Sequence, residues 1–237
     1  MTGAGLDLRG SSVLIAGATG GIGSAIARRM HERGARLTLV ARTEGGLGKL
    51  GVPGLRVMLD LRDPDNCRRA VEATVDHAGR LDAVVNAVGV VAFGPVTDLS
   101  VDAMEELFLT NSFVPIFLTR EALGRIGPGG VIVNISGVIA EQNLPGMAAY
   151  GASKAAVRAF DEAVAREARR QKVRMLDARP PHTETGLSTR AIEGDAPDLG
   201  AGLDPDVVAR TICDAIADGT TDLPSDAFTR TDASSRR

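Results

Sequence analysis

The sequence of 237 residues contains no tryptophan, one tyrosine and only six phenylalanines. Potential metal ligands are also few, with three histidines and two cysteines. Cys67 and Cys213 lie far apart and lack the spacing of a metal site, so no metal centre is expected and both thiols are expected to be reduced and buried. The single tyrosine, Tyr150, is therefore the one phenol in the chain.

The chain has neither a basic excess nor a long apolar run. Its formal net charge is −3, so nucleic acid is not expected as a partner, since that usually requires a strong basic excess. No apolar stretch approaches the roughly 20 residues that span a bilayer, and residues 1–20 lack the pattern of a secretory signal. With 44% apolar and 24% charged residues, the composition indicates a cytoplasmic globular enzyme that does not enter a membrane.

Short apolar segments alternate with longer helical patterns. Strands rich in Val, Leu and Ile are expected at 12–18, 36–42, 55–61, 82–88, 130–136 and 173–179. Helices are expected at 23–34, 63–79, 101–126 (with a bend at Pro115), 147–171 and 204–219. This alternation predicts an α/β fold with a doubly wound parallel sheet, the Rossmann fold, in a single domain.

Two segments do not fit the alternation. Residues 182–203 are irregular and rich in Gly, Thr and Asp, and an irregular stretch of this length is typical of a lid over a site or of disorder. The residues after Phe228 are polar, so 229–237 are expected to form a flexible tail. The domain itself is therefore expected to run over 1–228.

The segment AGATGGIGSAIA (16–27) lies between the first expected strand and the first expected helix. Gly17, Gly21 and Gly23 stand where the backbone has to turn sharply and approach a pyrophosphate closely. The free N–H groups at the start of the helix would then face the anion. A Gly-rich turn without function is the alternative, but the strand-turn-helix context favours a dinucleotide site.

The end of the second expected strand selects between the two nicotinamide dinucleotides. Ala41 stands where an NAD site usually has an acid that binds the ribose hydroxyls, and Arg42 follows it. A guanidinium suits a 2′-phosphate by its charge and its forked donors. A solvated arginine at a strand end is the alternative, but given the glycine turn the sequence favours NADP(H) over NAD(H).

Tyr150 and Lys154 lie four residues apart in a strong helical pattern and therefore on one helix face. A free phenol has a pKa of about 10, and a nearby ammonium is expected to lower it. The phenol could then act as general acid toward a carbonyl oxygen or as general base toward an alcohol. Alone, such a pair occurs by chance in many helices.

The pair does not stand alone. The glycine turn, VVNAVG (84–89), Asn111, NIS (134–136), the Tyr150–Lys154 pair and ARPPHTET (178–185) follow one another in an order that resembles the short-chain dehydrogenase/reductase family. The resemblance covers roughly residues 8 to 220. It implies a homodimer or homotetramer that transfers a hydride between a nicotinamide cofactor and a small-molecule carbonyl or alcohol.

The resemblance also implies roles for single residues. Tyr150 would be the general acid/base, Lys154 would tune it and bind the nicotinamide ribose, and Asn111 would kink a helix and anchor a water of the proton relay. Asp60 and Leu61 would hold the adenine. The implied cofactor-binding set is Gly17, Thr19, Gly21, Ile22, Gly23, Arg42, Asp60, Leu61, Asn86, Gly89, Tyr150, Lys154, Thr183 and Thr185.

Two departures from the family pattern matter for function. Gly137 stands where a serine hydroxyl would steady the substrate oxygen. The adjacent Ser136 is the remaining catalytic candidate, but it can substitute only if the backbone turns there, because neighbouring side chains on a strand point to opposite faces. Pro181 replaces a glycine and is expected to stiffen the start of the lid. His182 follows in the expected substrate region, where an exposed loop histidine is the simpler interpretation and a catalytic role the alternative.

The leading hypothesis is an NADP(H)-dependent oxidoreductase that acts on a carbonyl or alcohol. Gly137 motivates a second hypothesis, a nucleotide-binding scaffold or sensor whose catalysis is weakened. A non-redox lyase or epimerase on the same fold is a third. The Tyr150, Lys154 and Asn111 set favours the first.

Overall fold

The Val-, Leu- and Ile-rich segments form one parallel sheet in the computed structural model, which describes residues 4–234. Within that range seven strands pair in the order β3-β2-β1-β4-β5-β6-β7, and every pairing is parallel. Their bounds are β1 Ser12–Ala16, β2 Arg36–Ala41, β3 Leu55–Met58, β4 Ala83–Asn86, β5 Val131–Ile135, β6 Arg174–Ala178 and β7 Asp222–Leu223. The strand order reverses between β1 and β4, which opens a crevice at the carboxyl ends of the strands, where ligands bind in such folds.

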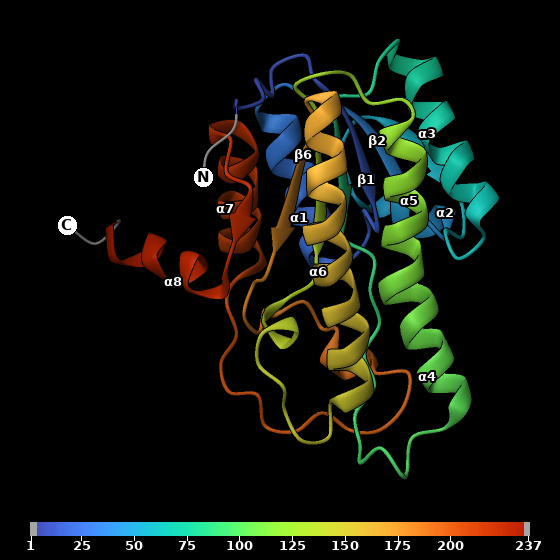
Figure 1. Ribbon diagram of the computed structural model, residues 1–237, viewed down its shortest axis with the longest axis vertical. Coiled ribbons are helices and arrows are strands. Elements are labelled where there is room, and N and C mark those ends of the chain that lie inside the picture. The colour runs from blue at the N-terminus through green and yellow to red at the C-terminus, as the bar shows by residue number, and fades with distance from the viewer. Residues whose placement is uncertain (1–3, 235–237) are drawn as a thin grey trace.

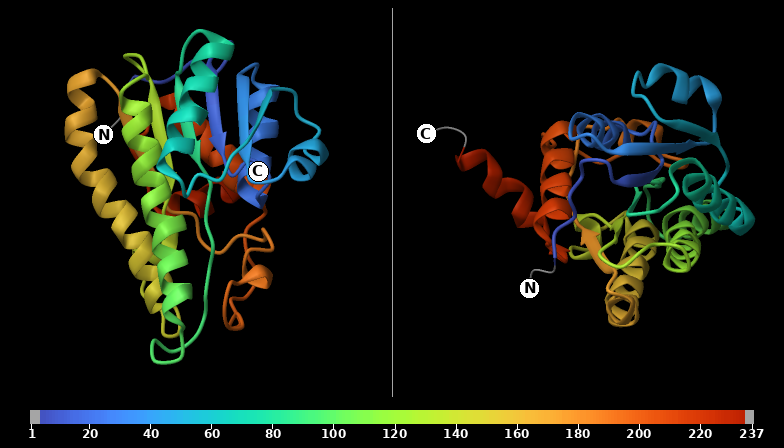
Figure 2. Two further views of the ribbon diagram at one scale, coloured as in Figure 1. Left: turned by 90° about the vertical axis from the view of Figure 1, so that its right-hand side faces the viewer. Right: turned by 90° about the horizontal axis from the view of Figure 1, so that it is seen from above.

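Helices cover both faces of the sheet (Figures 1 and 2). On one face α1 (Gly21–Glu32) packs against α7 (Pro205–Asp218), whereas α3 (Pro64–Ala78), α5 (Val114–Leu123) and α6 (Ala148–Ala168) contribute to the core on the other. Strand β1 serves both cores, since Val13 and Ile15 point to the first and Leu14 and Ala16 to the second. The predicted doubly wound α/β fold is therefore confirmed, and strands buried on both faces explain the near-continuous apolar runs.

The long helix that the sequence predicts over 101–126 is interrupted. The structure has α4 (Val101–Phe108), then a five-residue π-helical segment, η1 (Leu109–Phe113), and then α5. Pro115 lies in the first turn of α5, directly after this π-helical segment. The segment contains Asn111, the residue that the family resemblance expects to kink a helix, and π-helical segments of this kind are frequent at functional sites.

The C-terminal segment also differs from the expectation. Strand β7 extends the sheet, and α8 (Ser225–Ser234) projects from the body of the molecule (Figure 1). Residues 229–234, expected to belong to a flexible tail, continue α8, and 235–237 lie outside the described residues. The short helix α2 (Glu44–Lys49) was not expected either. No helix in the described part of the chain is long and apolar enough to cross a membrane.

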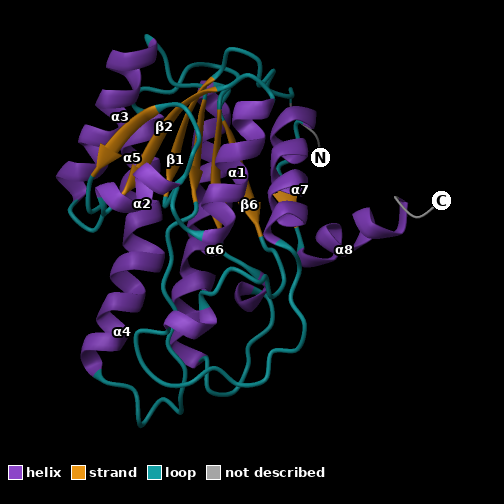
Figure 3. Cartoon of the chain, turned by 180° about the vertical axis from the view of Figure 1, so that it is seen from behind, coloured by secondary structure: helices purple, strands orange, loops and turns teal. Residues whose placement is uncertain are grey.

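Loops gather at the carboxyl edge of the sheet (Figure 3). They include the residues between β6 and α7, which contain one short 3₁₀ turn, Ser188–Arg190. We call residues 182–203 of this connection the lid. The lid is held by two isolated β-bridges, between Ala92 and Glu193 and between Thr183 and Leu203. It is therefore an ordered covering over this edge of the sheet.

Candidate functional site

One cavity of about 380 Å³ opens at the carboxyl edge of the sheet. Its lining joins the glycine turn, the ends of β2, β4 and β5, the start of α6 and the lid. The sequence-predicted residues that line it are Gly17, Thr19, Gly21, Ile22, Arg42, Asp60, Leu61, Gly89, Ser136, Tyr150, Lys154, Thr183 and Thr185. Gly23, Asn86 and Asn111 do not line it. Residues from most of the chain thus converge on a single site.

The glycine turn has no room for side chains. Gly17 has a φ of +74°, and a Cβ built on it would lie 2.8 Å from the carbonyl oxygen of Ala87. A Cβ on Gly23 would lie 2.2 Å from the carbonyl oxygen of Gly17. Helix α1 begins directly after Gly20, and no side chain caps it. The backbone N–H groups at this helix start are thus available to an anion, and the turn fits the pyrophosphate of a dinucleotide.

The lid packs directly on this turn. A Cβ built on Gly21 would lie 2.5 Å from Cβ of Thr185, so only a glycine lets the two segments meet. The carboxylate of Glu193 accepts hydrogen bonds from the backbone N–H and the hydroxyl of Ser100 at the start of α4, at 2.7 and 2.5 Å. The lid is therefore attached to the glycine turn at one point and to the start of α4 at another.

Two arginines, Arg42 and Arg62, line the part of the cavity that follows the ends of β2 and β3. Arg42 is exposed there, and Arg62 forms a bidentate contact with Asp60, with its Nε 3.0 Å from both carboxylate oxygens. A second nitrogen of Arg62 lies 3.0 Å from both oxygens of Glu106. Arg62, with a smaller contribution from Arg42, lowers the pKa of Asp60. Sequence reasoning missed Arg62, although its place two residues after Asp60 was a usable signal.

Lys154 lies deep in the cavity and is 6% exposed. Its Nζ donates to the carbonyl oxygen of Ile135 at 2.9 Å and lies 3.4 Å from where a Cβ on Gly89 would be. Burial lowers the pKa of the ammonium to about 8, and Asp177 opposes this shift. The cation thus stands close to the turn that follows β4.

Tyr150 is packed between two small apolar clusters, one formed by Val91, Phe93, Ile139 and Met147 and the other by residues of α4 and α6 with Ala92 and Leu99. Burial raises the pKa of its phenol to about 12. This direction is opposite to the lowering by Lys154 that the sequence suggests. Removal of the phenol from water is the cause of this rise.

Asn111 fixes the helix that carries the tyrosine. Its side-chain oxygen accepts from the N–H of Val90 and its nitrogen donates to the carbonyl of Val90, both at 2.9 Å. The same nitrogen donates to the hydroxyl of Ser153 at 3.0 Å, and that hydroxyl donates to the backbone carbonyl of Tyr150. The π-helical segment thus places Asn111 between the β4 loop and the first turn of α6.

Ser136 does not occupy the place of the family's serine. Its hydroxyl is fully buried and donates to the carboxylate of Asp177 at 2.5 Å, and a hydroxyl has only one proton to donate. Asp177 and Glu141 are in turn paired with Arg179. The backbone does turn at Gly137, with a φ of +81°, but this leaves Ser136 committed to a buried ionic cluster. The hydroxyl proton of Ser136 is therefore directed to Asp177 in this structure.

Gly137 itself borders open space. The one atom within 4 Å of a Cβ built there is the carbonyl oxygen of Pro180, at 3.9 Å. The positive φ disfavours any residue with a side chain, so a serine would be strained at this position. The wall beside Tyr150 lacks the hydroxyl that the family pattern places there.

Comparisons with known proteins agree with this geometry. The family model described as short chain dehydrogenase matches residues 11–196. The "Dehydrogenase/reductase SDR family member 7B" of Bos taurus is 30% identical over 231 residues, covering 88% of this chain and 71% of the relative. The "Versicolorin reductase stcU" of Emericella nidulans is 29% identical over 189 residues, covering 76% and 72%.

Solved structures show the same fold. A short chain dehydrogenase from Burkholderia cenocepacia, determined in complex with NADP, superposes with a TM-score of 0.81 at 24% identity and covers 94% of this chain and 98% of its own. The match of the family model extends from β1 through α6 into the lid. This chain belongs to the short-chain dehydrogenase/reductase family of oxidoreductases.

Proposed function

We propose that the chain is an NADP(H)-dependent reductase of small-molecule carbonyl compounds, with Tyr150 as the general acid. The observation that carries the proposal is a single cavity that contains both a turn fitting a pyrophosphate and the Tyr150–Lys154 pair. A bound dinucleotide would supply the hydride that the carbonyl carbon accepts. The residues of the chain then have to orient the carbonyl and deliver a proton to its oxygen.

The state of the phenol suits this task. With a pKa of about 12, Tyr150 keeps its proton at neutral pH and can give it to the oxygen of the carbonyl as negative charge develops there. The ammonium of Lys154 donates one of its three N–H groups to the carbonyl oxygen of Ile135. The other two can bind a ribose hydroxyl, and its positive charge can stabilise the phenolate that remains after proton transfer. Oxidation of an alcohol would need the phenolate at the start, which burial disfavours. The protonated phenol matches the starting state for reduction, so reduction is the direction that we propose.

The substrate of this reductase is expected to be largely apolar. The apolar residues Val91, Phe93, Ile139 and Met147 form a cluster against Tyr150 and line the cavity, together with Leu187 of the lid. Apolar walls with a few polar groups are typical of sites for small organic molecules. The printed name of the Emericella nidulans relative, a reductase, supports the same class of reaction.

NADPH oxidation measured with a panel of apolar ketones, quinones and enones tests the proposal. Turnover with at least one member of the panel is expected. Binding of NADPH without turnover anywhere in the panel would favour the weakened scaffold or sensor. Conversion of a substrate without any change in NADPH would favour a lyase or epimerase.

The preference for NADP(H) is predicted to depend on Arg42. Replacing it with Asp removes the exposed guanidinium and places a second carboxylate near Asp60. The ratio of kcat/KM for NADPH to that for NADH is expected to fall about 10–100-fold, the range for one lost charge-assisted hydrogen bond. Arg56→Asp, an exposed change on β3 outside the cavity, is the matched control. An unchanged ratio in Arg42→Asp would make the nucleotide assignment wrong.

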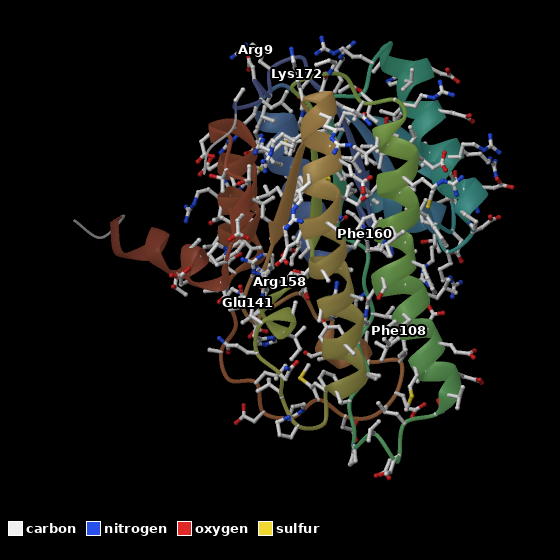
Figure 4. All side chains as sticks on the ribbon, in the orientation of Figure 1. Arg9, Phe108, Glu141, Arg158, Phe160 and Lys172 are labelled. Carbon is white, nitrogen blue, oxygen red and sulfur yellow. The ribbon has the colours of Figure 1, made fainter. Side chains whose placement is uncertain are left out.

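A homodimer or homotetramer remains our proposal for the assembly. Phe108 and Phe113 are 37% and 47% exposed on α4 and η1, and the ring of Phe113 stacks on Phe117 with centroids 5.7 Å apart. Figure 4 shows Phe108 on α4 and Phe160 on the neighbouring α6. Exposed aromatic side chains of this kind support burial against a second copy. A cytoplasmic location is proposed too, supported by the buried and unpaired thiols of Cys67 and Cys213.

A further inference from the structure

The proposed site lacks the serine hydroxyl that the family pattern places against the substrate oxygen. Besides Tyr150, a second hydrogen-bond donor on the substrate oxygen would hold the carbonyl in place and stabilise the developing charge. Gly137 has no side chain, and the hydroxyl of Ser136 is donated to Asp177. The donor therefore has to come from another part of the lining.

Most polar side chains of the lining are already engaged. The hydroxyl of Thr110 donates to Glu106 at 2.8 Å, and that of Thr183 donates to the carbonyl oxygen of Pro181 at 2.8 Å. Arg190 is held by two backbone carbonyls of the lid, at 2.9 and 3.2 Å. Thr185 packs on the glycine turn rather than beside the tyrosine.

His182 lies in the segment that meets the Gly137 turn. The N–H of Val138 donates to the carbonyl oxygen of Pro180 at 2.9 Å, and that same oxygen is the atom nearest to the missing Cβ of Gly137. His182 follows two residues later and lines the cavity with Tyr150. Its side chain is 27% exposed. His182 therefore lines the same cavity as Gly137, the position where the family has a serine.

The ring of His182 has Glu184 and Gly202 as neighbours along one edge. Its Nε2 lies 3.6 Å from Oε1 of Glu184, and that oxygen also accepts the N–H of Gly202 at 2.7 Å. A Cβ built on Gly202 would lie 2.8 Å from Cδ2 of the ring, so the glycine makes room for it. The opposite edge, with Nδ1, has no hydrogen-bond partner among the described residues. With its hydrogen on Nδ1, the imidazole can donate from this free edge.

We propose that His182, oriented by Glu184 and Gly202, donates the second hydrogen bond to the substrate oxygen in place of the missing serine. The donor comes from the lid instead of from the end of β5. His182 is then a catalytic residue, and Glu184 is a positioning residue. The inference rests on the proposed reductase function.

Replacing His182 with Phe tests the inference, with the substrate that the wild type reduces fastest. Loss of one donor to a developing oxyanion is expected to lower kcat about 10²–10³-fold, with a smaller change in KM because the bond strengthens in the transition state. NADPH affinity should not change. His182→Asn, whose amide N–H can take the place of Nδ1–H, should recover at least a tenth of the lost rate. His77→Phe, at an exposed position on α3, is the control for a histidine outside the site.

A double-mutant cycle separates catalysis from packing. Glu184→Gln and Gly202→Ala should each lower kcat in the wild type and have no further effect in His182→Phe. A kcat for His182→Phe within threefold of the wild type would overturn the inference, provided that Tyr150→Phe loses activity, and would leave the proposed function intact. Equal losses in His182→Phe and His182→Asn would also overturn it, because they would indicate a packing role. A wild type that reduces no substrate would overturn the proposed function and this inference together.

Discussion

Tyr150→Phe is expected to lower kcat/KM for carbonyl reduction by about 10²–10⁴-fold, the range for a lost general acid. The substitution removes only the hydroxyl, so the ring still fills the space between the two apolar clusters around it. The backbone carbonyl of residue 150 still accepts from Ser153. Steady-state rates of NADPH oxidation, together with NADPH affinity from fluorescence titration, measure the two effects separately.

Affinity for NADPH should stay within about twofold, since the phenol is proposed to act on the substrate oxygen. Thermal unfolding should be close to that of the wild type, which excludes misfolding as the cause of the loss. A variant that reduces its substrate at the wild-type rate would remove the phenol from the mechanism and leave the glycine turn as the only functional feature.

Lys154→Met is expected to show loss of activity without loss of stability. The shift of the ammonium pKa from 10.5 to about 8 corresponds to about 3 kcal/mol of unfavourable burial at pH 7. Methionine removes this cost but also the hydrogen bond to Ile135, which contributes about 1 kcal/mol. The free energy of unfolding at pH 7 should therefore rise by about 1–2 kcal/mol or stay unchanged, while kcat/KM falls at least about 10²-fold.

The pH dependence of stability provides a further signature of Lys154. Because its pKa is lower in the folded protein, the unfolded chain binds more protons between about pH 8 and 10.5. Stability contributed by this group therefore rises with pH across that window and is lowest below it. Urea unfolding at several pH values should show this rise in the wild type and not in Lys154→Met. A variant that is less stable than the wild type at pH 7 and retains the rise would contradict the pKa direction.

The sheet and the nucleotide turn could be predicted because their causes are local. Apolar runs such as SVLIAGA mark strands that are buried on both faces, and Gly17 and Gly23 stand where a Cβ would strike backbone atoms. Arg42 and Asp60 could be placed at the carboxyl edge for the same reason, since each lies at the end of an expected strand. Each of these predictions depends only on the identity of residues that are neighbours in the sequence.

The features that were missed depend on contacts distant in sequence. The hydroxyl of Ser136 is held by Asp177, 41 residues away, and no local pattern reveals that pairing. Burial of Tyr150 by residues of the β4 loop reverses the expected direction of its pKa shift. The helical periodicity of 101–126 does not reveal the π-helical segment around Asn111, which the family resemblance alone indicated, and Asn111 is hydrogen-bonded there to Val90, 21 residues away.

Transfer of deuterium from NADPH that carries deuterium at both C4 positions of the nicotinamide tests the central claim most directly. Mass spectrometry of the product after reduction with the labelled cofactor measures the transfer. We predict an alcohol with one deuterium on the former carbonyl carbon. A product without deuterium, formed at the same rate with labelled and unlabelled NADPH, would contradict hydride transfer by this protein.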